Sequence, residues 1–81
     1  MNAISAVVRN REGIVFEGPV FAVSSINEIG PFDILSDHAN FVCTIKDNLI
    51  IHQARDKKQE IKIDTGILSV KANKIEVYIG I

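Results

Sequence analysis

The sequence contains little of what disulfide-bonded, metal-binding or membrane-spanning proteins need. Cys43 is the single cysteine among 81 residues, which excludes an internal disulfide. With only His38 and His52 to add, the chain also lacks the ligands of a closed structural zinc site. No window approaches the run of about eighteen apolar residues that a membrane-spanning helix needs, and Met1–Ile4 does not begin a signal peptide. These absences predict a soluble protein of a reducing compartment, most simply the cytoplasm.

Neither charge nor aromatic content favours nucleic acid as a partner. The net charge of −1 is not that of a protein whose main task is to neutralise phosphate. The one dense basic run, Arg55–Lys58, holds no aromatic residue and is typical of a solvated hairpin tip. The five glycines are isolated from one another, so the chain has no glycine-rich phosphate loop. We therefore expect no bound nucleotide and no cofactor.

What the chain does contain is enough apolar mass for one small domain. Hydrophobic residues make up 47% of it and charged residues 23%, well outside the range of disordered chains. Its length predicts a single domain over residues 1–81. A chain of this size buries only about 60–65% of its unfolded surface, which leaves little volume for a deep polar cleft.

Apolar residues recur at every second position along most of the chain, which is the period of a β-strand. No segment carries the helical period over three turns, and turn-forming residues separate the apolar runs. Short strands about ten residues apart predict an all-β fold, an antiparallel β-sandwich or flattened barrel of about ten short strands. Alternation places these residues in the predicted core: Phe16, Phe41, Cys43, Leu68, Val70, Ile75 and Val77.

Clusters of turn-forming residues mark where the chain is expected to reverse direction. Asn10–Gly13, Lys46–Asn48 and Ala72–Asn73 are each expected to turn the chain between two strands. Arg55–Lys58 is expected to form the tip of a hairpin whose strands are residues 49–54 and 59–64.

The alternation breaks once, from Gly30 to Phe41. Gly and Pro open this stretch with a turn signal, and its apolar residues are too few for a helix. Asp33, Ser36 and His38 follow, which suggests either a minimal hydrolase or a structured corner between two sheets. The corner is favoured, because Asp and Ser commonly bond to nearby backbone groups. A catalytic triad also needs an oriented base and an oxyanion site, which proximity in sequence does not supply.

Several short motifs occur in order along the chain. They are Val15-Phe16-Glu17-Gly18, Phe32-Asp33-Ile34-Leu35, His38-Ala39, Thr65-Gly66-Ile67-Leu68-Ser69-Val70 and Asn73-Lys74-Ile75-Glu76-Val77. Their order and spacing resemble the N-terminal domain of the epsilon subunit of rotary F-type ATP synthases, over essentially the whole chain. Asp33, Ser36 and Asn40 depart from that family, which usually has Gly, Pro and Pro at these places. The pair of C-terminal helices that most members carry does not follow, so we expect a naturally short member or one cut at the domain boundary.

The resemblance implies a non-catalytic central-stalk subunit of a proton-translocating ATP synthase, which couples the gamma subunit to the membrane c-ring. The subunit would lie at the cytoplasmic face of the membrane, as a peripheral part of the complex that does not insert into the bilayer. The c-ring side would comprise Asn27, Glu28, Ile29, Gly30, Pro31 and Phe32. The gamma side would comprise Ser36, Asp37, His38, Ala39, Asn40, Val42 and Thr44.

Two questions stay open at the level of the residues. Ile29 is an apolar side chain in a polar loop, and it either makes a partner contact or folds back onto the sandwich. A small ligand- or nucleic-acid-binding β-barrel is the alternative function. Such a barrel would carry aromatic residues two apart on an exposed strand for stacking. Here each phenylalanine and Tyr78 stands alone in its segment, so we expect core packing for all of them except Tyr78.

Overall fold

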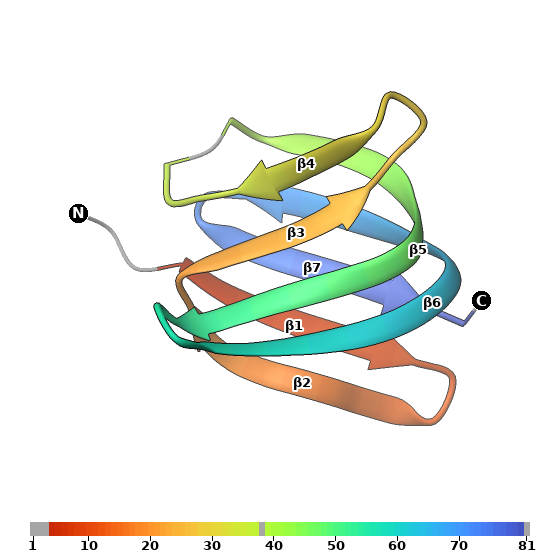
Figure 1. The fold of residues 1–81 in the computed structure, drawn as a ribbon, viewed down its shortest axis with the longest axis horizontal. Helices are drawn as coiled ribbons and strands as arrows, with labels where there is room; N and C mark the ends of the chain where they lie inside the picture. The colour runs from red at the N-terminus through yellow and green to blue at the C-terminus, as the bar shows by residue number, and fades with distance from the viewer. Residues whose placement is uncertain (1–3, 38, 81) are drawn as a thin grey trace.

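Seven β-strands make up most of the computed structural model, which describes residues 4–37 and 39–80 (Figure 1). The strands are β1 (Ile4–Asn10), β2 (Gly13–Val20), β3 (Ala22–Ile26), β4 (Pro31–Ile34), β5 (Phe41–Ala54), β6 (Lys57–Lys71) and β7 (Lys74–Ile79). The described residues form no helix, and none of them is part of a segment suited to crossing a membrane as one. The predicted all-β class is confirmed.

The strands form one sheet in the order β2-β1-β7-β6-β5-β3-β4. Neighbouring strands are antiparallel except for β1 and β7, which run in parallel from the Ser5–Lys74 pair to the Arg9–Tyr78 pair. This parallel pair departs from the predicted antiparallel arrangement. It forms because β7 leaves its hairpin with β6 alongside the first strand of the chain, so that the last strand pairs with the first.

β5 and β6 are the longest strands, with 14 and 15 residues, and each of them passes through both halves of the molecule. Their pairing shifts between Lys46 and Asp47, opposite Thr65 and Ile63, so Asp64 is an extra residue that forms a bulge. A bulge bends a strand and increases its twist without ending it. Figure 1 shows the two strands curving together at this place, which folds the single sheet over on itself.

The bulge explains why the strands are fewer and longer than the predicted set of about ten. Lys46–Asn48 was expected to reverse the chain, and Asp47 does have the positive φ of many turn residues, at 70°. The chain nevertheless continues forward into the second half of β5. A backbone hydrogen bond of 2.7 Å from the Phe21 N–H to the His52 carbonyl oxygen extends the pairing of β3 with β5 to the corner between β2 and β3.

Inward-facing aliphatic side chains from all seven strands fill the space between the two halves. Leu68, Val70, Ile75 and Val77 are buried as predicted. Among the described residues, those buried in this core are Ile4, Ala6, Val8, Val20, Val23, Ile34, Ile45, Leu49, Ile51, Leu68, Val70, Ile75, Val77 and Ile79. None of them is charged, so the core gains its stability from apolar burial.

The aromatic residues lie at the margin of this core. Phe16, Phe41 and Cys43 were predicted to be core residues, but they are half-buried and pack against its edge. Phe16 lies on the edge strand β2, and Phe41 begins β5, where its ring meets Phe32 edge-on with centroids 5.8 Å apart. Phe21 is 57% exposed, so its expected core packing is wrong. It occupies the corner between β2 and β3, and its neighbours Val20 and Ala22 take the inward positions.

Candidate partner-binding surfaces

The loop between β3 and β4 is held in shape by the side chain of its first residue. Asn27 Oδ1 accepts hydrogen bonds from the backbone N–H groups of Ile29, at 2.9 Å, and Gly30, at 3.2 Å. The Asn27 N–H donates in turn to the Gly30 carbonyl oxygen at 3.0 Å. Gly30 has a φ of 146°, which a residue with a side chain rarely adopts. The motif is an Asx-turn, and its hydrogen bonds close the loop within residues 27–30.

This turn projects Ile29 into solvent. The side chain is 96% exposed, the largest exposed fraction among the large apolar side chains that the structure describes. The alternative in which Ile29 folds back onto the sandwich is therefore wrong. The reason is geometric, because an Asx-turn of three residues is too tight to return its tip to the sheet.

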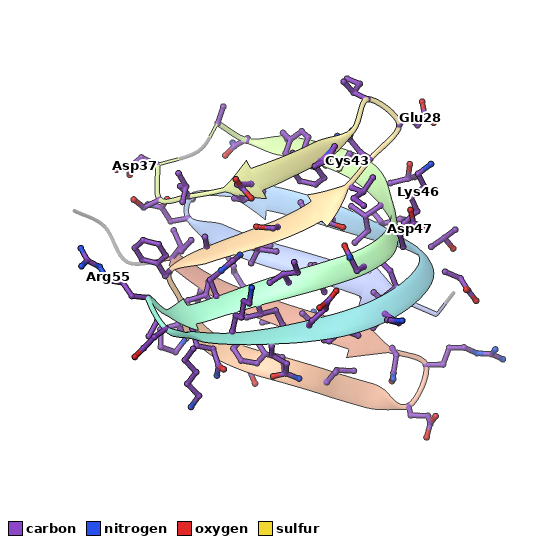
Figure 2. All side chains as sticks on the ribbon, in the orientation of Figure 1. Glu28, Asp37, Cys43, Lys46, Asp47 and Arg55 are labelled. Atoms are coloured by element: carbon purple, nitrogen blue, oxygen red, sulfur yellow. The ribbon has the colours of Figure 1, made fainter. Side chains whose placement is uncertain are left out.

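An open hollow of about 320 Å³ lies beside the loop. Figure 2 shows Glu28 and Cys43 at this end of the molecule, next to the start of β5. Six residues line the hollow: Asn27, Glu28, Ile29, Phe41, Cys43 and Thr44. The structure thus brings Thr44, predicted for the gamma side, next to residues that were predicted for the c-ring side. The two predicted surfaces adjoin each other along the first half of β5.

Cys43 forms part of this hollow as a half-buried thiol. Burial raises the pKa of the Cys43 thiol, and a hydrogen bond with the Asn27 side chain opposes that change only in part. A raised pKa keeps the thiol protonated near neutral pH, and the protonated form is a poor nucleophile. Cys43 therefore acts here as a small, weakly polar packing residue.

The segment that links β4 to β5 is held by a turn from elsewhere in the chain. The Asp37 N–H donates to Asn73 Oδ1 at 2.7 Å, and Asn73 Nδ2 donates back to Asp37 Oδ1 at 3.4 Å. The Ala72 N–H donates to Asn40 Oδ1 at 3.2 Å. Asp37, Ala39 and Asn40 are exposed and Ser36 is half-buried, whereas His38 lies outside the described residues. The predicted gamma-side segment thus rests on the turn between β6 and β7.

The outer face of the sheet beside this segment carries exposed apolar side chains. Val42 is 69% exposed, and Thr44 is paired across the sheet with Ile67, which is paired with Tyr78. Ile67 is 39% and Tyr78 43% exposed. Tyr78 is thus exposed, as expected. The Arg9 guanidinium lies over the Tyr78 ring, 5.7 Å from its centroid. Thr44, Ile67, Tyr78 and Arg9 thus lie side by side across four neighbouring strands.

Sequence reasoning did not assign Ile67 and Arg9 to a surface. The signal for Ile67 was present, because Leu68 and Val70 point inward and the strand period then turns Ile67 outward. Arg9 carried no such signal. Its place depends on the parallel pairing of β1 with β7 and on an ion pair with Glu76, with 3.3 Å between Nη1 and Oε2.

Of the suggested group of Asp33, Ser36 and His38, His38 lies outside the described residues, and Asp33 bonds to a serine on β3. Asp33 Oδ1 accepts a hydrogen bond of 2.5 Å from the hydroxyl of Ser24, which lies opposite it on β3. Ser24 Oγ also lies 2.9 Å from His52 Nε2. A serine hydroxyl has one proton, and here it is given to Asp33, so Nε2 must be the donor in the second bond. Among Ser24, Asp33 and His52, no base accepts the Ser24 proton as the histidine of a catalytic triad does.

Two further features of the described residues bear on ligand binding. No group of three His, Cys, Asp or Glu side chains converges as metal ligands would within residues 4–37 and 39–80. A second hollow, of about 500 Å³, lies at the bulge and is lined by Asp47, Asn48, Lys62, Ile63 and Asp64. Its lining is mostly charged, unlike the mainly apolar lining of small-molecule sites.

Comparison with known proteins gives the family. Residues 4–79 match the family model of the β-sandwich domain of the ATP synthase delta/epsilon chain. The chain belongs to this family. The resemblance to epsilon N-terminal domains seen in the sequence is thereby confirmed, and with it the sandwich fold.

Individual relatives agree with this membership. The ATP synthase epsilon chain of a Nitratiruptor species is 31% identical over 75 residues, which cover 91% of this chain and 58% of that one. A chain in the Euglena gracilis mitochondrial ATP synthase matches with a TM-score of 0.87 at 18% identity, over 95% of this chain and 50% of its own length. A chain in the central stalk and c-ring of the Tetrahymena thermophila mitochondrial enzyme matches with a TM-score of 0.81 at 12% identity, over 96% and 63%. The latter two show the shared fold, and the chain spans only half to two-thirds of the length of these relatives.

Proposed function

We propose that this chain is a non-catalytic central-stalk subunit of a proton-translocating F-type ATP synthase that couples the gamma subunit to the c-ring. Membership of the delta/epsilon family over residues 4–79 supports the complex to which it is assigned. We assign it to the cytoplasmic face of the membrane, as a peripheral part of that complex, with no bound nucleotide and no nucleic acid.

One observation carries the proposal. Among the described residues, the two most exposed large apolar side chains are Ile29, at 96%, and Val42, at 69%, and one lies in each predicted interface. A small soluble domain gains nothing by exposing side chains of this size, whereas interfaces are built around such groups. The exposure of these two residues is the expected result if each is covered by a different partner.

The c-ring contact is assigned to the loop at Asn27–Pro31, called here the ring-side loop. Its Asx-turn holds Ile29 outward before any partner arrives, so binding does not have to order the loop. Glu28 and Pro31 are exposed beside it and complete a small contact area. Phe32 was grouped with this surface, and its half-buried ring packs edge-on against Phe41.

The gamma contact is assigned to the outer face of β5, β6 and β7, called here the gamma-side face. It comprises Val42 and Thr44 with Ile67 and Tyr78 beside them. We assign Ser36, Asp37, Ala39 and Asn40 to its rim. An apolar centre with a polar rim is the usual composition of a protein interface. Tyr78 supplies the kind of amphipathic ring that often contributes most to binding.

The alternative of a stacking surface for nucleic acid has no support on the exposed strands. Phe21 and Tyr78 are the exposed aromatic residues among those described, and they belong to different segments. Successive bases need aromatic side chains in sequence along one groove.

Binding measurements with the purified gamma subunit and with the c-ring of the same organism test the assignment. Ile29→Asp should weaken binding to the ring by about tenfold or more, equivalent to about 1.4 kcal/mol, and leave gamma binding unchanged. Val42→Asp should do the reverse. Phe21→Asp is the matched control, because it places the same charge on a side chain that is 57% exposed outside both surfaces. Equal effects of all three substitutions, or none, would count against both interfaces.

A further inference from the structure

The turn between β6 and β7 and the rim of the gamma-side face are far apart in sequence and bonded in space. Asp37 and Asn73 are separated by 36 positions and exchange two hydrogen bonds, of 2.7 Å and 3.4 Å. Asn40 and Ala72 are separated by 32 positions and form a third bond of 3.2 Å. Two adjacent turn residues therefore hold Asp37 and Asn40.

Asparagine at position 73 suits both the backbone conformation of the turn and the hydrogen bonds with Asp37. The turn is a two-residue hairpin in which Ala72 and Asn73 have positive φ values of 51° and 62°, as a type I′ turn requires. Asparagine tolerates that backbone conformation better than most residues. Its side chain also carries both an acceptor, for the Asp37 N–H, and a donor, for the Asp37 carboxylate. Aspartate at this position would lack the donor, and glycine would lack both groups.

Asn73 also ties the turn to the start of the chain. Its carbonyl oxygen accepts a hydrogen bond of 3.1 Å from the Ser5 N–H, at the beginning of β1. The turn is thus anchored through β1 and β7 to the centre of the sheet, where Ala6 and Ile75 are fully buried. Asp37 and Asn40, which bond to this turn, are therefore attached to a rigid part of the sheet.

We propose that Asn73 is a positioning residue for the gamma interface, which holds Asp37, at the edge of that interface, in its binding conformation through their paired hydrogen bonds. This inference rests on the proposed function. Asn73 does not itself belong to the gamma-side face. It acts by reducing the ordering that Asp37 would otherwise undergo on binding.

The test removes the side chain without changing the turn. Asn73→Gly keeps a residue that readily adopts positive φ but eliminates both bonds to Asp37. Ala72→Gly is the matched control, because it alters the same turn and leaves Asn73 and the Ala72 N–H in place. We expect Asn73→Gly to weaken binding to the purified gamma subunit by about three- to tenfold, with faster hydrogen exchange at the Asp37 amide. The control should retain the parent's affinity and exchange rate.

A rescue variant separates positioning from a general loss of structure. Asn73→Asp sets two carboxylates against each other and should weaken gamma binding. The double variant Asp37→Asn/Asn73→Asp reverses the direction of the side-chain bond and keeps an acceptor for the backbone N–H of residue 37, so it should recover the affinity of Asp37→Asn alone. A thermal melt of each variant shows whether a change in affinity is merely a change in stability.

The outcomes are distinct. If the parent binds gamma and Asn73→Gly binds within about twofold of Ala72→Gly, Asn73 does not position the interface. Unchanged exchange at the Asp37 amide in Asn73→Gly, or failure of the double variant to recover, would also overturn the inference. If the parent itself does not bind gamma, the proposed function fails first, and the role of Asn73 in that interface fails with it.

Discussion

The two proposed surfaces adjoin each other but are held in shape by different means. The ring-side loop is closed by Asn27, whose side chain bonds to residues two and three positions ahead. The rim of the gamma-side face is fixed by Asn73, 36 positions from the residue it bonds to. The first surface depends on local chemistry and the second on the assembled sheet. Perturbing the sheet should therefore affect the gamma-side face more than the ring-side loop.

The largest expected effect comes from removing core volume, which tests whether both surfaces need the sandwich. Leu68 is fully buried, and Leu68→Ala should lower the free energy of unfolding by about 2–5 kcal/mol. Ile67→Ala is the control on the same strand, where a side chain that is 39% exposed should cost about 1 kcal/mol or less. Urea unfolding of both variants gives the comparison. Equal losses would show that the inward and outward faces of β6 are misassigned.

Gly66 tests the place where β6 bends between the two halves. A Cβ atom there would lie 2.7 Å from the Tyr78 carbonyl oxygen and 3.3 Å from the Ile45 side chain. Gly66→Ala should therefore cost about 1–3 kcal/mol through overpacking, with β7 displaced. Since β7 carries Tyr78, gamma binding should suffer more than ring binding. Thr65→Ala, at an exposed neighbouring position, provides the baseline melt.

Asn27→Ala tests whether the ring-side loop is held by the Asn27 side chain. It leaves the N–H groups of Ile29 and Gly30 without their side-chain acceptor, so their hydrogen exchange should accelerate while that of Asp37 stays unchanged. The free energy of unfolding should fall by only about 0.5–1.5 kcal/mol, because the lost bonds are exposed to solvent. Faster exchange at Asp37 as well would mean that the two surfaces are not held independently.

The smallest expected effect is a gain. Ala72 has a φ of 51°, a conformation that costs an alanine more than an asparagine. Ala72→Asn should raise the free energy of unfolding by about 0.5–1 kcal/mol and leave the Asn73 bonds intact. A thermal melt checks the sign. A lower melting temperature would show that Ala72 packs in a way that its exposed position does not indicate.

The contrast between local and distant support also explains what the sequence could predict. The period of two in residues 67–79 identified the strands and the burial of Leu68, Val70, Ile75 and Val77, because strand alternation is a local property. Ile29 was identified as a contact candidate because it is an apolar residue in a polar loop, which is also a local property of the sequence. Its exposure then followed from an Asx-turn that lies wholly within Asn27–Gly30.

Features that depend on pairing across the sheet were not predictable in this way. Asp47 and Ala72 both have positive φ, yet one lies in a bulge and the other in a hairpin turn. Only the register of β5 with β6 separates the two cases. The parallel pairing of β1 with β7, the place of Arg9 and the bond between Asn73 and Asp37 likewise arise from contacts distant in sequence. The support of the gamma-side face by Arg9 and Asn73 could therefore not be predicted from the sequence, whereas the outward position of Ile67 could have been predicted from the strand period.

The most direct test of the central claim is an NMR titration of the isotope-labelled chain with the purified gamma subunit. The account predicts that amide shift changes concentrate at Asp37, Val42, Thr44, Ile67 and Tyr78, with the Ile29 amide little affected until the c-ring is added. Shift changes centred instead on Ser24, His52 and Lys58, or no saturable change at all, would contradict it.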